Sequence, residues 1–241
     1  GKHAVNNDHS FEWKASYAVT NRVQPDVSTI FYDTNGQFDS QNPMTKYYND
    51  HNEYNYQFIP EYTMRFKQWS GLSSKFILGG DINRKNRTNE GRRFQIEPQE
   101  SLPANQNNMT SDPETIFDSN LMQVNENTGQ NISAGLDSYE AYTEIFAGYG
   151  IFDLLITRDF RLIAGVRVEN WKQSVKAYTV IADAESTSSI SGTEVLPSAN
   201  LVFSATRSIN LRLGYSMTIN RPEFVEMGNY NYYDQLETGL S

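Results

Sequence analysis

The sequence has no cysteine and only three histidines, His3, His9 and His51, in 241 residues. The lack of cysteine excludes disulfide bonds and thiolate metal sites, and the histidines are too scattered for the ligand spacing of a zinc site. No run of 18 apolar residues occurs, so a transmembrane helix is not predicted. Acidic residues outnumber basic ones and give a net charge of -9, which argues against general binding to nucleic acids.

Catalytic signatures are also missing from the sequence. There is no G-x-S-x-G nucleophile elbow and no phosphate-binding loop, and no acid–base pair can be assigned around His51. We therefore predict no enzyme activity, no cofactor and no metal ion. The acidic segment 97–137 contains no Lys or Arg, but it lacks the spacing of an EF-hand loop, so we favour a solvated loop over a calcium site.

Aromatic residues are frequent at 13%, with 15 tyrosines, and apolar residues recur at every second position in several stretches. The clearest stretch is 209–219, where polar residues or glycine separate Ile209, Leu211, Leu213, Tyr215, Met217 and Ile219. Alternation with a period of two predicts one β-strand with an apolar and a polar face. About 11 residues suffice to cross a bilayer when the strand is tilted. Pro222 is predicted to end this strand, since proline cannot donate to a ladder.

The same alternation predicts about eight long antiparallel strands in an all-β chain. The other predicted strands are 11–21, 27–33, 52–67, 74–84 with an extension at 92–96, 138–152, 160–169 with an extension towards 180, and 193–206. Short turns are predicted at 22–26, 68–73, 153–159 and 207–208, and long loops at 34–51, 97–137 and 181–192. Residues 1–10 are expected to be frayed, and the strands, roughly 11–227, are assigned to one partial barrel domain, 1–241.

Alternation alone fits two kinds of fold. One is a soluble sandwich or small barrel with the apolar stripes inside, and the other is a membrane barrel with the apolar stripes towards lipid. Long strands, aromatic residues near strand ends, and short turns alternating with long loops favour the membrane barrel. In that fold a set of charged residues on the polar faces lines a wet lumen: Glu61, Arg65, Arg161, Arg167, Glu169 and Arg212.

Several segments, in order along the chain, carry a resemblance to a known family. They read L-P-S-A-N-L at 196–201, L-R-L-G-Y-S at 211–216 and I-N-R-P-E-F at 219–224, with A-G-V-R-V-E at 164–169, Y-E-A-Y at 139–142 and the hairpin 75–87 before them. Together they resemble the barrel of TonB-dependent outer-membrane receptors, especially those of Bacteroidetes type. The motif residues carried over from the resemblance are Arg221, Pro222, Glu223 and Phe224.

The resemblance implies a bacterial outer-membrane barrel of about 22 strands with a plugged lumen. Such receptors import siderophores, cobalamin or glycans, with energy from the TonB complex. The implied partners are outer-membrane lipid, the plug, the remaining barrel strands, TonB acting through the plug, and a small-molecule or glycan ligand. This sequence has room for about eight strands and no plug or TonB box, so we interpret it as part of a barrel. The alternative is a non-transporting adhesin or structural barrel.

Aromatic residues in the predicted outer loops are candidates for ligand contact, since they can stack on a sugar or lie at the bilayer interface. They are Tyr47, Tyr48, Tyr230, Tyr232 and Tyr233. For Arg221, a structural ion pair at the lumen or rim is preferred to a ligand contact.

The charged faces also predict an open sheet. An eight-stranded closed barrel has an interior just filled by side chains, and burying long charged groups there without partners is costly. We therefore expect the strand near Phe11 and the strand near Tyr215 to be sheet edges that do not pair with each other.

Overall fold

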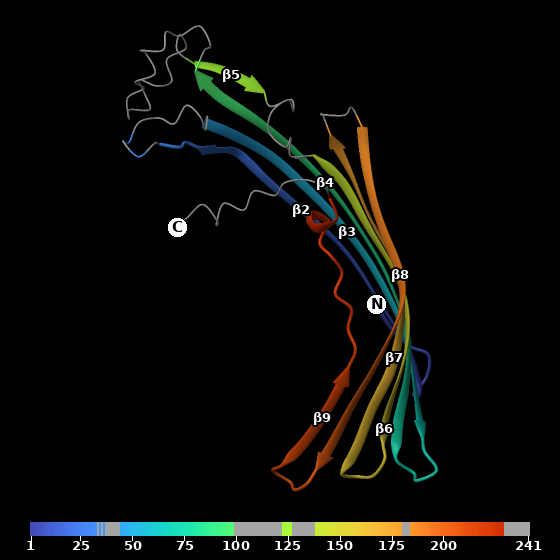
Figure 1. Cartoon of the computed structure of the whole chain (residues 1–241). Coiled ribbons are helices and arrows are strands. Elements are labelled where there is room, and N and C mark those ends of the chain that lie inside the picture. Colours follow the sequence, from blue (N-terminus) through green and yellow to red (C-terminus); the bar gives the residue numbers. More distant parts are fainter. Residues whose placement is uncertain are drawn as a thin grey trace.

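The structure is a computed structural model that describes residues 1–32, 34, 36, 44–98, 122–126, 138–179 and 184–228. These residues form one strongly curved antiparallel sheet (Figure 1). Its strands are β1 (Lys2–Ala4), β2 (His9–Thr29), β3 (Met44–Lys67), β4 (Ser73–Pro98), β5 (Met122–Glu126), β6 (Tyr139–Leu155), β7 (Phe160–Thr179), β8 (Ala184–Ser204) and β9 (Asn210–Ser216). A short helix, α2 (Phe224–Met227), lies in the hollow of the sheet. Among the described residues, none of the helical structure is long and apolar enough to span a membrane.

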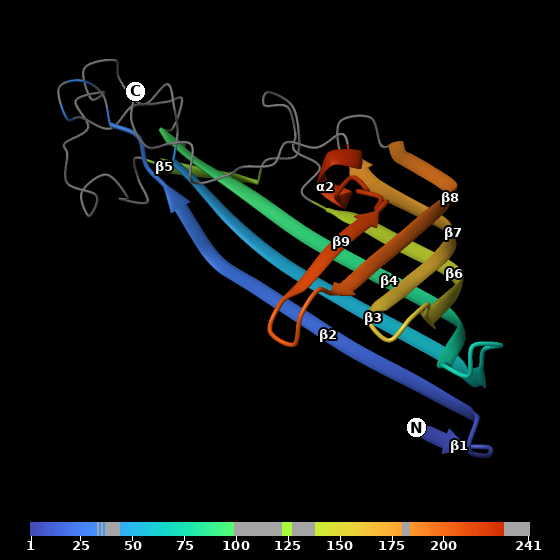
Figure 2. The ribbon, with the colours of Figure 1, turned by 90° about the horizontal axis from the view of Figure 1, so that it is seen from below.

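The sheet is a meander in which neighbouring strands of the chain pair with each other. The strand order is β1-β2-β3-β4-β6-β7-β8-β9, and β5 pairs with the outer end of β4. Over the described ranges no ladder joins β2 to β9, so the predicted open sheet is confirmed (Figure 2). One detail is wrong: β1 pairs with Ser10, Phe11 and Glu12 and covers that part of the expected edge. The predicted frayed start is therefore partly strand.

Cross-strand register separates the two faces of the sheet. Leu78 lies opposite Tyr62 and Gly150, and Leu213 lies opposite Leu201, all on the convex side. Leu78 and Leu213 are well exposed to the surroundings, Leu213 at 70% of its surface. The concave face, over which α2 lies, carries the polar half of the alternating stretches in β3, β4, β7 and β9, whereas β6 turns Ala141, Ile145, Ala147 and Tyr149 to this face. Outside β6, the predicted alternation of apolar and polar faces thus corresponds to the two sides of one curved wall.

Two strands are longer than predicted at the rim away from the short turns. The expected turn 22–26 is an irregularity between Gln24 and Val27 within a continuous β2. The expected loop 34–51 is wrong from residue 44 onwards, because β3 begins at Met44 and pairs with both β2 and β4. Backbone ladders on both sides stabilise this part of β3, so its side chains need no apolar face.

Two further loop predictions also need correction. The serine-rich loop 181–192 is wrong from residue 184, since β8 begins at Ala184 and pairs with β7 along its full length. In the acidic segment 97–137, β5 adds a short strand beside β4, and the rest of that segment lies outside the described residues except for the last two residues of β4.

The last predicted strand is shorter than its alternation suggests. β9 ends at Ser216, although the apolar and polar positions continue to alternate up to Ile219. The chain then leaves the sheet and continues along the concave side, away from the short turns, to α2 (Figure 1). Short connections at 5–8, 68–72, 156–159 and 205–209 share one rim, which we call the turn rim.

Candidate functional site

The concave face holds all the charged residues that the sequence assigned to a lumen. Register places Glu61, Gly79, Tyr149 and Arg167 in one row across four strands, with Glu169 two residues further along β7. Arg65 lies in a second row, opposite Lys75, nearer the turn rim. A third row at that rim contains Arg161, Val202 and Arg212. The predicted set therefore shares one face, although its members belong to separate groups of contacts.

A chain of ion pairs crosses the middle of this face, and we call it the central charge chain. Arg167 Nη2 donates to Asp81 Oδ2 at 2.9 Å, and Arg167 Nε donates to Glu169 Oε1 at 2.5 Å. Arg221 donates to the other carboxylate oxygen of Glu169. Residue Glu169 is only 7% exposed. Gln57 donates to Asp81 at 3.0 Å and completes the chain on β3. Because each carboxylate has cationic or amide donors, these half-buried charges are compensated.

Tyr149 lies over Gly79 on the neighbouring strand, beside the central charge chain. A Cβ atom at residue 79 would overlap the Tyr149 ring, so the close approach requires glycine. The Tyr149 hydroxyl donates to Glu61 Oε2 at 3.1 Å, and the guanidinium of Arg167 lies 6.0 Å from the ring centroid. The aromatic ring thus connects the predicted residues Glu61 and Arg167 across two strands.

The motif residues form a segment that returns to the sheet, and we call residues 219–228 the strap. Arg221 bonds to Glu169, and Gln173 Nε2 donates to the Pro222 carbonyl at 2.8 Å. Glu223 is the N-cap of α2 and forms a capping box with Glu226, which gives the short helix a defined start. Phe224 is 3% exposed. The prediction that Arg221 forms a structural ion pair agrees with this geometry.

A second ion pair lies beside the strap, in the outer parts of β3 and β4. Arg87 donates to Glu53 Oε2 from Nε at 2.8 Å and from Nη2 at 2.5 Å, and Lys85 lies 3.6 Å from Oε1. Glu53 and Arg87 each lie more than about 11 residues along their strands from the turn rim. Because about 11 residues cross a bilayer, both lie outside the membrane-spanning part. Burial acts to raise the pKa of the Glu53 carboxyl, but the hydrogen bonds and charges of Arg87 and Lys85 outweigh it and lower that pKa.

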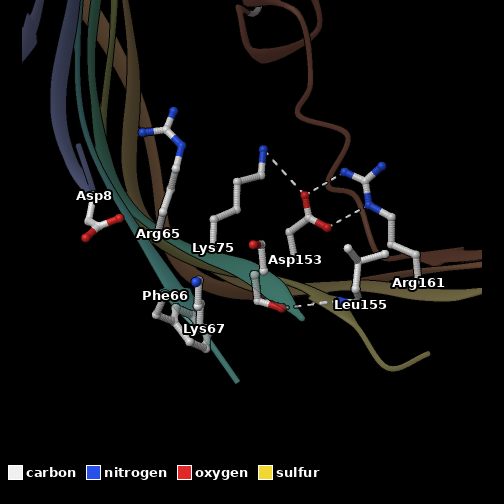
Figure 3. A pocket seen from close by; sticks show the side chains of 10 residues that line it. Asp8, Arg65, Phe66, Lys67, Lys75, Asp153, Leu155 and Arg161 are labelled. Carbon is white, nitrogen blue, oxygen red and sulfur yellow. Dashed lines mark hydrogen bonds and ion pairs between the residues drawn. The ribbon is translucent and has the colours of Figure 1, made fainter. Parts of the chain in front are cut away.

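A cavity of about 440 Å³ opens on the concave face at the turn rim (Figure 3). Asp153 lies within it and accepts hydrogen bonds from Arg161 at 2.7 and 2.6 Å, with Lys75 Nζ at 3.4 Å. The planar guanidinium of Arg161 fits both carboxylate oxygens, so this pair is geometrically fixed.

The same cavity has more basic than acidic side chains. Arg65 and Lys67 line it without an ion pair to any described residue, and Asp8 is the second carboxylate beside Asp153. Two carboxylates therefore face four cationic side chains, in a chain whose net charge is -9. The cavity is a local basic site on the inner wall.

The candidate aromatic residues of the outer loops are not brought together. Tyr47 and Tyr48 belong to β3 rather than to a loop, and they point to opposite faces because strand neighbours alternate. Tyr48 packs edge-on against Phe94 on the convex side, with ring centroids 5.6 Å apart. Tyr47 lies on the concave side. The other candidates, Tyr230, Tyr232 and Tyr233, lie outside the described residues.

Sequence reasoning missed the partners that complete these sites. They are Glu53, Lys75, Asp81, Arg87, Tyr149 and Asp153. For Glu53, Lys75 and Asp81, the polar position in a predicted strand was a usable signal for the face, but not for the contact. Among the described residues no group of three or more His, Asp or Glu side chains could hold a metal ion.

A curved sheet with an apolar convex side and a charged concave side is the wall of a large barrel with a wet interior. The family model described as "TonB dependent receptor-like, beta-barrel" matches residues 2–240, so the chain belongs to this family. These receptors are β-barrel transport receptors of the outer membrane.

Solved structures agree on the fold. The ferric-catecholate import receptor Fiu of E. coli K12 matches in its closed form at TM-score 0.59 with 16% identity, covering 89% of this chain and 31% of that chain. Its open form matches at 0.58 with 17% identity, covering 89% and 34%. The unliganded ferric citrate transporter FecA matches at 0.52 with 16% identity, covering 88% and 25%. No curated protein matches. The chain spans about a third or less of these receptors, and the likeness concerns the fold.

Proposed function

We propose that this chain is the barrel portion of a TonB-dependent receptor that imports a scarce nutrient across the outer membrane. The observation that supports this most is the concave face, where an ordered central charge chain lines a wall that is apolar on its other side. Long charged side chains on this face need a water-filled interior, which large barrels provide and small closed barrels do not. Siderophores, cobalamin and glycans are the nutrient classes proposed.

The sheet edges indicate what else such a receptor needs. Strand β9 pairs with β8 only over Ser198–Ser204, and β8 continues outward beyond it. An unpaired strand edge is not tolerated in lipid, because every backbone group there must be satisfied. We infer that further barrel strands pair with β8, β9 and the outer part of β2, and that outer-membrane lipid contacts the convex side.

The basic cavity at the turn rim is the proposed contact for a plug domain. Arg65 and Lys67 have no ion-pair partner among the described residues, so acidic side chains on a plug segment would complete the cavity. Through such a plug the receptor would connect to the TonB complex. Ligand contact from the outer part of the inner wall is proposed for Tyr47, with Tyr230, Tyr232 and Tyr233 as further candidates.

Growth and uptake assays in the native bacterium test this function. A strain without the gene should lose growth on one limiting nutrient among ferric siderophores, cobalamin and glycans, and removal of TonB should cause the same loss. The coding sequence before Gly1 should encode a plug domain with a TonB box. Retained uptake of all three nutrient classes, together with an adhesin domain before Gly1, would show a non-transporting barrel instead.

A further inference from the structure

Phe224 occupies an apolar slot on the concave face. The slot is formed by Tyr139, Ala141, Val175 and Ala177, each at most 5% exposed, and the Phe224 ring completes this cluster. These residues belong to β6 and β7, whereas Phe224 comes from the strap. The slot is therefore filled by a ring from a segment that is not part of the sheet.

The slot also holds a fixed cation over the ring. The guanidinium carbon of Arg87 lies 4.9 Å from the Phe224 ring centroid. Two hydrogen bonds to Glu53, a residue outside the strap, hold this guanidinium. A cation above the face favours an aromatic ring over a saturated one, and Ala141, Val175 and Ala177 add aliphatic walls. The slot thus selects for a flat π system.

The strap that carries Phe224 has few attachments to the wall. It is held by the Arg221–Glu169 ion pair, by the Arg221 guanidinium over the Trp171 ring at 5.2 Å, by the hydrogen bond from Gln173 to Pro222, and by Phe224 with Met227 beside it. Residues 217–223 lie in neither strand nor helix, and α2 has four residues. A segment with so few contacts can leave the wall without disturbing any strand.

We propose that this slot is an aryl-binding site on the inner wall, with Phe224 as a tethered occupant that an aromatic group of the imported ligand displaces. The proposal rests on the import function proposed above, from which it takes the presence of a ligand in the barrel. It adds a chemical class, a ring with an exposed π face, and a residue that competes for the same place.

Because Phe224 is tethered to the chain, it competes with a free ligand ring for the slot. An intramolecular ring competes at an effective concentration of about millimolar or more, so a free ring of equal affinity binds weakly while the strap is in place. Removing the Phe224 side chain leaves an apolar cavity, and such cavities stay dry and accept benzene-sized molecules. Weakening the Glu169 anchor should have a similar but smaller effect, because it frees the strap and keeps the ring.

Fluorine NMR of 4-fluorophenol with the detergent-solubilised receptor that contains this chain tests the proposal. The F224A variant should bind the probe saturably, at least about tenfold more tightly than the parent protein. R87Q in the F224A background should weaken binding about two- to fivefold, the loss expected for one cation–π contact. V225A, on the same helix but outside the slot cluster, is the matched control and should bind like the parent.

Several outcomes separate a ring site from a simple hole. E169Q, which keeps Phe224, should bind the probe more tightly than the parent and less tightly than F224A. Equal competition by cyclohexanol and phenol for the site in F224A would overturn the proposal, as would absence of probe binding by both F224A and E169Q. If the ring binds but no nutrient is imported, only the proposed function fails. If import persists without ring binding, only the slot proposal fails.

Discussion

Replacing Leu213 by arginine tests which side of the sheet meets lipid. Leu213 pairs with Leu201 on the convex side and is 70% exposed, whereas its neighbour Arg212 pairs with Val202 on the concave side. Leu213 lies a few residues from the turn rim. In a strand tilted by about 40° this separation places it roughly 10 Å above the rim, near the middle of the apolar band. L213R should therefore destabilise the protein folded in a bilayer by about 2–4 kcal/mol.

The matched control is Arg212→Leu on the same strand. Arg212 forms no ion pair with any described residue, and its side chain is exposed, so its loss should change stability by about 0.5 kcal/mol or less. Urea titrations of the receptor folded into lipid vesicles measure both variants. Equal costs, or a larger cost for R212L, would refute the assignment of the convex side to lipid.

Three other perturbations test the inner wall. G79L should displace the Tyr149 ring and cost about 1–3 kcal/mol in urea unfolding, whereas G148A, which meets open space, should be nearly neutral; similar costs for both would contradict the packing. R167K should lose about 1–3 kcal/mol, because an ammonium cannot serve two carboxylates as the guanidinium does, and full stability would contradict this. The pKa of Glu53 is lowered in the folded protein, so this ion pair stabilises the fold above the ordinary pKa of 4.5, and the stabilisation is lost as pH falls through the pKa of the folded state. R87Q should flatten this pH dependence of the free energy of unfolding. An unchanged profile of unfolding against pH would argue against the pair.

The sequence was sufficient to predict the face of the charged side chains, although β6 turns Ala141, Ile145 and Ala147 to the same concave face. Alternation has a period of two, and a pleated strand converts that period directly into two sides of a sheet. Glu61, Arg167 and Glu169 were assigned to the polar face on this basis, and the register places them on the concave side. The open sheet followed from the same charges, because a small closed barrel has no room for them.

Strand length could not be predicted from the same pattern. Residues 44–51 and 184–192 have no clear apolar alternation, so they were expected to be loops, yet both continue strands. Beyond the apolar band neither face needs apolar side chains, and the ladders to neighbouring strands hold the backbone. The hydrophobic pattern therefore marks only the part of each strand that meets an apolar surface.

Contacts between distant residues were also beyond sequence reasoning. Asp81 and Arg167 are 86 positions apart, and they meet because β4, β6 and β7 pair in one particular register. A shift of the register by one residue would place every polar side chain of a strand on the other face. Gly79 and Tyr149 depend on the same register, because the Tyr149 ring fits over residue 79 only when the two residues lie opposite each other.

The end of β9 shows how a tertiary contact overrides the alternation. Met217 still donates to the Pro197 carbonyl at 3.0 Å, so the ladder begins to continue past Ser216. The chain then turns to the concave side, where Arg221 reaches Glu169 and Phe224 fills its slot. Pro222 cannot donate to a ladder, so the strand would have to stop within a few residues in any case. Alternation thus fixed the two faces of this stretch, while partners on β6 and β7 determined where the strand ended.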